Sequence, residues 1–195
     1  MTYTVTVYAD AGSLSSFLLP GHVFYVLSDG TNSYSYGLYP ASRTDLMLNG
    51  VFNPVGGQVS TTDFQQDHPD PTASRSYDIT QEQFDSLKGS SDAMVSNPPL
   101  YDLNDHSCVD FVRGMLRGIG IDVEHSVGNP NTPVGVALDI TIANIADRLR
   151  QVGDLFSGIA ANFIDGISNW VSDFYTRAQR WVQRRDPLTF DLDGD

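Results

Sequence analysis

Residues 22–40 carry the pattern that most restricts the fold, because two apolar runs meet at a tight turn. The first run, HVFYVLS, leads into Asp29-Gly30, and the second, SYSYGLY, ends at Pro40. An Asp-Gly pair between β-branched and aromatic runs predicts a β-hairpin. If residues 29–32 form the turn, paired residues have numbers that sum to about 61. That register places Tyr39 opposite His22, with Ser35 on the same face because side chains alternate along a strand.

Other stretches predict a mixture of strands and helices. Residues 2–8 alternate in a strand-like manner. Thr80, with a glutamine three residues later, predicts a capped helix that ends at Gly89. Apolar spacing predicts a second helix over 107–116. Residues 41–76 are rich in Gly, Pro, Asp, Ser and Thr, so we expect mostly loops there.

Composition narrows the range of partners. The formal net charge is −13, which argues against a nucleic-acid partner because phosphate binding requires a basic face. The chain has no run of about 18 apolar residues, so we expect no integral membrane segment. Its one cysteine cannot form an internal disulfide, and the first residues show no secretory signal. We expect no metal and no cofactor.

The C-terminal part differs in pattern from the rest. Apolar residues recur in steps of three and four, which predicts a helix or helical hairpin over 138–185. A Gly/Pro/Asn-rich linker is expected at 126–137, after a first domain of 1–125. The ending 186–195 resembles the junctions in large secreted bacterial proteins with calcium-binding repeats. Its aspartates have the spacing that opens a calcium loop: Asp191, Asp193 and Asp195.

Cys108 is the one cysteine, and it lies in the predicted first turn of the 107–116 helix. A thiolate is the nucleophilic form of cysteine, and backbone N–H groups at a helix N-terminus favour that anion. The same groups can hold an oxyanion. A nucleophilic cysteine also needs a base. The candidates are the four histidines: His22, His68, His106 and His125.

The stretches GHVFYVLSDG, YSYGLYP, YDITQEQFDSL and YDLNDHSCVDFVRGML together resemble bacterial papain-like cysteine hydrolases. The likeness is to the circularly permuted NlpC-like branch, which includes lecithin:retinol acyltransferase-like enzymes. It implies an α+β fold in which an antiparallel sheet packs on the cysteine helix, with a C-terminal helical extension. It also implies that Cys108 is the nucleophile and His22 the base. The candidates for orienting the histidine are Tyr39 and Ser35, but neither is the usual Asn, Asp or His. The alternatives are a dyad of Cys108 and His22, or an orienting residue from elsewhere in the chain. Relatives commonly have Asn before the cysteine, where this chain has Ser107.

The resemblance suggests a hydrolase that cleaves an amide bond in peptidoglycan peptides. Such a protein would be an antibacterial effector, exported by a dedicated machine such as type VI secretion and active in the target-cell periplasm. A secretion carrier and an immunity protein are the expected partners. A host-cytosol target is the alternative location.

Two other functions are compatible with the same residues. The first is a lipid esterase or acyltransferase toxin, with an acyl-chain groove built from Phe17, Leu18, Leu19 and Phe24. The second is an adaptor module in which Cys108 is inert.

Overall fold

The computed structural model describes seven stretches of the chain: 2–12, 21–48, 53–64, 68–103, 105–123, 131–151 and 165–177. The predicted hairpin forms the centre of its antiparallel sheet. β2 (His22–Ser28) pairs with β3 (Ser33–Pro40) in the predicted register, from Tyr25–Tyr36 to Ser28–Ser33. Gly30 adopts a positive φ of 86° in the turn, a conformation that costs glycine little.

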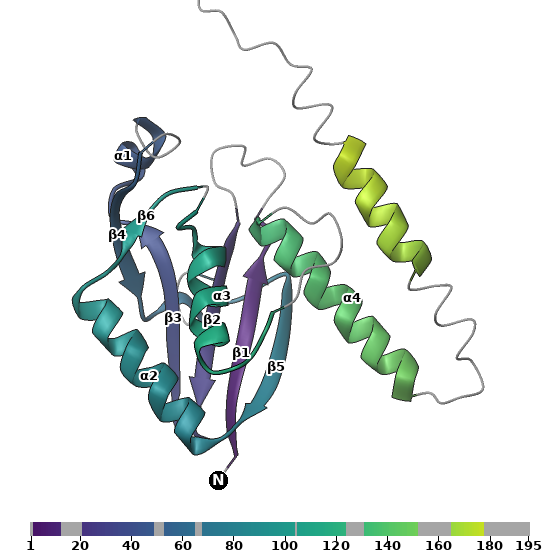
Figure 1. Ribbon diagram of the computed structural model, residues 1–195, viewed down its shortest axis with the longest axis horizontal. Helices are drawn as coiled ribbons and strands as arrows, with labels where there is room; N and C mark the ends of the chain where they lie inside the picture. Colours follow the sequence, from purple (N-terminus) through teal and green to yellow (C-terminus); the bar gives the residue numbers. More distant parts are fainter. Residues whose placement is uncertain are drawn as a thin grey trace, which may run out of the picture. The chain divides into compact units, whose positions relative to one another are not determined.

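Six strands make up the sheet, in the order β5-β1-β2-β3-β4-β6. The remaining strands are β1 (Tyr3–Asp10), β4 (Val55–Ser60), β5 (Ala73–Ile79) and β6 (Leu100–Tyr101). Every pairing given for these strands is antiparallel. Together with the helices described below, the sheet makes this an α+β protein (Figure 1).

The expectation of mostly loops over 41–76 is wrong. This part contains the short helix α1 (Arg43–Leu48), strand β4 and most of β5. β5 alternates between half-buried and exposed positions and carries polar residues such as Ser74, Arg75 and Asp78. A short polar strand at a sheet edge is stabilised by its neighbour rather than by its own composition, so composition alone did not reveal it.

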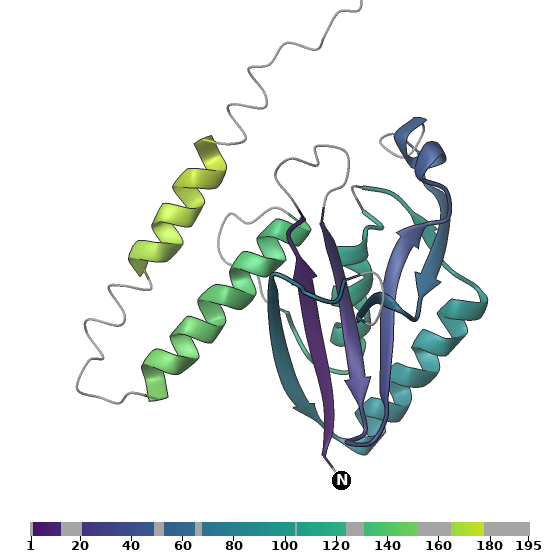
Figure 2. The same cartoon turned by 180° about the vertical axis from the view of Figure 1, so that it is seen from behind.

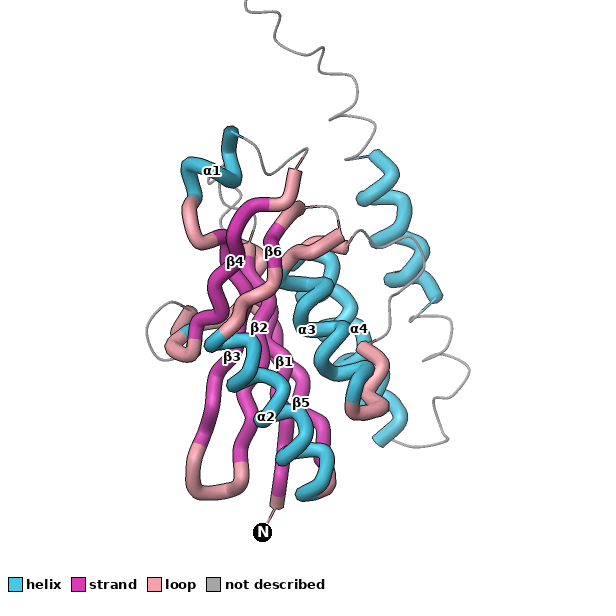
Figure 3. Tube along the Cα trace, turned by 60° about the vertical axis from the view of Figure 1, so that its left-hand side comes forward, coloured by secondary structure: helices cyan, strands magenta, loops and turns pink. Residues whose placement is uncertain are grey.

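Two helices cover one face of the sheet, α2 (Gln81–Ser96) and α3 (Cys108–Gly118) (Figures 1 and 3). The view from behind shows the strands in front of both helices (Figure 2). Two tyrosine hydroxyls link α2 to the sheet: Tyr25 lies 2.6 Å from Ser91 Oγ, and Tyr36 donates to Asp92 Oδ1 at 2.7 Å. The core between these layers contains Val5, Val7, Val23, Leu27, Leu87, Val109 and Leu116.

Both predicted helix starts are confirmed, and one predicted end is wrong. Thr80 and Ser107 are N-caps with complete capping boxes. α2 continues past Gly89 to Ser96 and is followed by the cap residue Asn97. A Cβ at Gly89 would meet nothing within 4 Å, so this glycine lies on an open helix face and does not terminate the helix. Pro98 follows the cap and cannot extend the helix.

The chain divides into two compact units, residues 1–124 with 130–144 and residues 125–129 with 145–195. Helix α4 (Pro133–Gln151) begins inside the range predicted as a linker. Its first turns contribute Val136, Ala137 and Ile140 to the core of the first unit.

In the second unit residues 165–177 are helical, as the apolar stripe predicts. The calcium-loop-like ending lies outside the described residues and stays a prediction. No helix within the described stretches is long and apolar enough to cross a membrane.

Candidate functional site

Cys108 is the first residue of α3 and is buried, with 4% of its surface exposed. Ser107 caps the helix: its Oγ accepts from the Asp110 N–H at 3.4 Å, and its own N–H donates to Asp110 Oδ2 at 3.0 Å. The Ser107 hydroxyl also lies 2.6 Å from the same carboxylate oxygen. This local cap fixes where α3 begins, and therefore fixes the thiol at the positive end of the helix.

The segment that leads to the cysteine is held by Asp102, which is 7% exposed. Its Oδ1 accepts from the Asp105 N–H at 2.7 Å, and its Oδ2 lies 2.8 Å from His106 Nδ1. The Asp102 N–H donates to the carbonyl of His106 at 3.2 Å. His106 is thus held in this turn through its Nδ1.

His22 lies at the start of β2, is 5% exposed, and is held by a buried carboxylate. Its Nε2 lies 3.1 Å from Oδ1 of Asp63, whose side chain is fully buried. Asp63 comes just after β4, 41 residues further along the chain. Cys108 is a second neighbour of this ring, and its interaction with His22 acts to raise the pKa of the imidazole.

The backbone of β3 makes room for this pair. The ladder between β2 and β3 ends at Tyr25–Tyr36, and from Gly37 onward β3 pairs with β4 instead. A Cβ on Gly37 would lie 2.5 Å from His22 Nε2 and 2.8 Å from Asp63 Oδ1. Any larger residue at position 37 would displace the imidazole or the carboxylate, so this glycine is part of the site.

The environment of His22 raises the pKa of its imidazole from 6.5 to about 9. Burial is the largest influence and acts in the opposite direction, because it disfavours the charged ring. Hydrogen bonds to Asp63 and Cys108, together with the negative charges of both groups, outweigh burial. At neutral pH the ring is therefore protonated.

Tyr101 on β6 is a further contact of the cysteine. Its pKa is raised, first by burial and then by the charge of Cys108 and a side-chain hydrogen bond with it. The phenol thus stays protonated at neutral pH and provides a donor beside the sulfur. No sequence motif marks Tyr101. Its position seven residues before the cysteine gives no signal until β6 returns to pair with β4.

The two residues proposed to orient the histidine lie in different surroundings. The Tyr39 ring stacks on His22 with centroids 4.0 Å apart, and its hydroxyl donates to Asp63 Oδ1 at 2.5 Å. Ser35 is buried on the same strand, but its Oγ has no hydrogen-bond partner among the described residues. The structure thus brings Tyr39 and His22 together, because Asp63 Oδ1 contacts both the Tyr39 hydroxyl and His22 Nε2. Ser35 makes no hydrogen bond to this group.

His68 is a second histidine beside the site. Its ring stacks on that of His22 at 5.0 Å, and its Nδ1 lies 2.6 Å from Asp10 Oδ2. The His68 N–H donates to the backbone carbonyl of Asp63 at 2.6 Å. Asp10 is itself the strand partner of His22. His68 therefore packs the imidazole from one side and fixes the backbone of the residue that holds it.

Asp63 was missed because nothing in the sequence around it resembles a motif. It follows Ser-Thr-Thr in a stretch that was expected to be loop. Its place beside His22 depends on β4 pairing with β3, which a single sequence does not reveal. His125 lies outside the described residues. Within the described stretches, no group of three or more His, Cys, Asp or Glu side chains could hold a metal ion.

Comparisons with known proteins found one similar solved structure. No protein-family model matches the chain, and no curated protein matches it in sequence. Among solved structures, the crystal structure of the type VI secretion system effector TseH is similar. The TM-score is 0.46 at 14% identity, over 73% of this chain and 88% of TseH. Chemical conclusions about this chain therefore rest on its own residues.

Proposed function

We propose that the protein is a cysteine hydrolase in which Cys108, His22 and Asp63 act as a catalytic triad. One observation carries the proposal: the buried imidazole of His22 hydrogen-bonds to the Asp63 carboxylate and has its pKa raised by both Asp63 and Cys108, the first residue of a helix. A nucleophile, a base and a third group that orients the base are the parts that covalent acyl transfer requires.

The first half of the reaction forms an acyl-enzyme. The Cys108 thiolate attacks the carbonyl carbon of an amide or ester, and a carbon–sulfur bond forms. Backbone N–H groups in the first turn of α3 stabilise the oxyanion. Protonated His22 then gives its proton to the leaving amine or alcohol as the carbon–nitrogen or carbon–oxygen bond breaks.

The second half releases the acyl group. Neutral His22 takes a proton from water, which attacks the thioester carbonyl and frees the carboxylic acid. Asp63 keeps Nε2 of the ring occupied in both halves, so the other nitrogen always faces Cys108. Tyr39 fixes Asp63 through its hydroxyl.

The order of these residues along the chain suits the permuted papain-like arrangement, with the histidine strand before the cysteine helix. That resemblance supports an amide bond of peptidoglycan peptides as the target. It also supports the role of an antibacterial effector that is carried by a secretion machine and acts in the target-cell periplasm. The partners of such an effector would be a carrier and an immunity protein.

The test is expression in the periplasm of a test bacterium. We would express the wild type, Cys108→Ala, His22→Gln and Asp63→Asn, with surface variant Asp78→Asn as the matched control. Lysis would be followed over time, and muropeptides and lipids would be analysed by mass spectrometry. We expect lysis and one new cleavage product with the wild type and Asp78→Asn, and neither with Cys108→Ala.

Equal lysis by the wild type and Cys108→Ala would contradict the proposal. New muropeptides would identify the peptidoglycan amide as the substrate. Released fatty acids with an intact wall would identify the lipid ester. Iodoacetamide labelling of purified protein gives an independent check, since an inert packed Cys108 would not react at neutral pH.

A further inference from the structure

A second histidine–aspartate pair lies beside the proposed triad. His68 Nδ1 is 2.6 Å from Asp10 Oδ2, and the two side chains are 19% and 27% exposed. The other carboxylate oxygen of Asp10 accepts from the Gly12 N–H at 2.9 Å. A contact of 2.6 Å is short for a nitrogen donor, as expected when the acceptor is a carboxylate. The pair joins segments 58 residues apart, so it is a tertiary contact and not a local turn.

The pair contacts the residues of the histidine half of the site. Asp10 is directly opposite His22 in the ladder of β1 and β2, so their side chains are neighbours on one face of the sheet. The His68 ring stacks on the His22 ring with centroids 5.0 Å apart and an interplanar angle of 26°. The main-chain N–H of His68 donates to the Asp63 carbonyl at 2.6 Å. The pair thus fastens the segment that carries Asp63 to the strand beside His22.

The Asp63 carboxylate depends on this anchor because its side-chain contacts are one-sided. Its Oδ1 contacts both His22 Nε2 and the Tyr39 hydroxyl. Its Oδ2 is buried and has no hydrogen-bond partner among the described residues. A carboxylate that is held at one oxygen can shift with its backbone, so the bond from the His68 N–H limits where Oδ1 can lie.

Phe24 packs against both imidazoles. Its ring centroid lies 5.9 Å from that of His22 and 5.9 Å from that of His68, and the side chain is fully buried. Phe24 is therefore not free to line the acyl-chain groove expected from the sequence. The other residues of that groove, 17–19, lie outside the described stretches.

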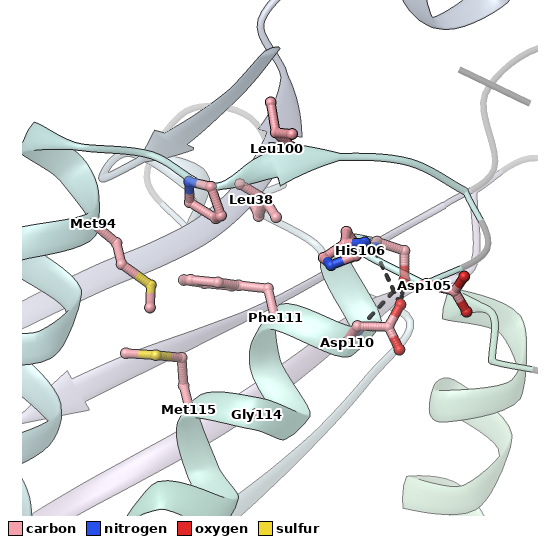
Figure 4. A pocket seen from close by; sticks show the side chains of 11 residues that line it. Leu38, Met94, Leu100, Asp105, His106, Asp110, Phe111, Gly114 and Met115 are labelled. Carbon is pink, nitrogen blue, oxygen red and sulfur yellow. Dashed lines mark hydrogen bonds between the residues drawn. The ribbon is translucent and has the colours of Figure 1, made fainter. Parts of the chain in front are cut away.

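His106 offers a contrast within the same molecule. It also pairs through Nδ1 with a carboxylate, that of Asp102, at 2.8 Å. The two residues are four apart in sequence, and the His106 side chain is 59% exposed and lines a pocket of about 300 Å³ (Figure 4). His68 and Asp10 do not line this pocket. The first pair holds one turn, whereas the His68–Asp10 pair joins two distant segments at the triad.

We propose that His68 and Asp10 are positioning residues of the hydrolase, a second pair that holds the Asp63 carboxylate against His22 in both halves of the reaction. This rests on the proposed function and adds to its machinery. The two residues act through Asp63 and His22, and no bond of the substrate forms or breaks at either of them.

The charge of Asp10 acts in the same direction as its position. Burial tends to raise the pKa of Asp10, but hydrogen bonds with Gly12 and His68 and the charges of His68 and His22 lower it. Asp10 is therefore ionised at neutral pH, and its negative charge favours the charged form of His22. Titratable side chains face His22 from each element around it: Asp10 on β1, Tyr39 on β3, Asp63 and His68 after β4, and Cys108 on α3.

The first experiment titrates His22 and requires no substrate. Protein with isotope-labelled histidine would be followed by NMR as wild type, Asp10→Asn and the matched surface variant Asp78→Asn, and His22→Gln would assign the signal. We expect the pKa of His22 in Asp10→Asn to fall from about 9 toward 6.5, because the ring loses a nearby negative charge and a firmly held Asp63. Asp78→Asn should titrate as the wild type does. Equal pKa values in the two variants would overturn the proposal.

The second experiment separates the hydrogen bond of His68 from the packing of its ring. His68→Phe keeps a stacked ring without Nδ1, and His68→Asn keeps an amide N–H near the position of Nδ1 without the ring. Both kcat and KM would be measured on p-nitrophenyl acetate, whose acyl-enzyme needs His22 to activate water. We expect kcat to fall about tenfold or more in His68→Phe, since a misplacement of about 1 Å costs roughly 10²-fold.

The same measurement distinguishes positioning from substrate contact. KM should stay nearly unchanged in His68→Phe, and kcat should be clearly higher in His68→Asn than in His68→Phe. A rise in KM without a fall in kcat would overturn the proposal, as would a kcat in His68→Asn no higher than in His68→Phe. If the wild type cleaves no ester, the proposed hydrolase fails for this probe, and the NMR titration alone decides whether Asp10 supports His22.

Discussion

The cysteine half and the histidine half of this site are built in different ways. Cys108 is positioned by residues next to it in sequence, because Ser107 and Asp110 cap α3 across three residues. His22 is positioned by Asp63, 41 residues away, through a hydrogen bond in a fully buried place. A cap can form as soon as the helix does, whereas the His22–Asp63 pair requires three strands to assemble first. We therefore expect substitutions in the histidine half to lower activity more than substitutions in the cysteine half.

Among variants that keep both Cys108 and His22, the largest effect is expected for Asp63→Asn. Without the carboxylate, the ring loses the partner that orients it and stabilises its charged form. Loss of the corresponding carboxylate in a serine hydrolase triad costs roughly 10⁴-fold in kcat, and we expect at least 10²-fold here. Steady-state kinetics would measure it, with Asp78→Asn as control. A loss below fivefold would show that Cys108 and His22 work as a dyad.

The next effect is expected for Gly37→Ala. The new methyl would lie 2.5 Å from His22 Nε2 and must displace the ring or Asp63. We expect a loss of activity of roughly 10- to 100-fold, comparable to a misplacement of about 1 Å in a reacting group. Gly56→Ala is the control, since its Cβ would meet only the Ala41 Cβ at 3.8 Å. If both variants retain full activity, the histidine half tolerates more movement than its packing indicates.

A pH titration tests the charge of the histidine half. The pKa of His22 is raised from 6.5 to about 9, so its stabilising contribution is full below pH 6.5 and is lost as pH rises through 9. The difference in unfolding free energy between the wild type and His22→Gln should therefore shrink between those limits. Denaturant melts at several pH values would measure it. A difference that grows with pH would mean that His22 is buried in its neutral form.

The smallest effect is expected for Ser107→Ala in the cysteine half. Loss of an N-cap side chain costs about 1 kcal/mol, here by removing the acceptor for the Asp110 N–H. We expect a lower midpoint in urea with an unchanged His22 pKa by NMR. Thr80→Ala, the equivalent change in α2, should cost a similar amount without touching the site. A shift in the His22 pKa with Ser107→Ala alone would show that the two halves are coupled through the cap.

The sequence by itself determined the features that depend on near neighbours. The Asp-Gly turn fixed the register of β2 and β3 from Tyr25–Tyr36 to Ser28–Ser33. The stacking of Tyr39 on His22 lies beyond the end of that ladder. The Ser107 cap placed Cys108 at a helix N-terminus, and Thr80 marked the start of α2. These signals work because turns and caps are formed by hydrogen bonds across two to four residues.

Only the tertiary structure decided the rest of the site. Asp63, Tyr101 and His68 come from segments without a motif, and they reach Cys108 or His22 only when β4 and β6 join the sheet edge. Gly37 is an ordinary strand glycine in sequence, and its role appears when two polar groups occupy the space over its Cα. The cause is physical: pairing between distant strands depends on the packing of the whole sheet, which no short window of sequence contains.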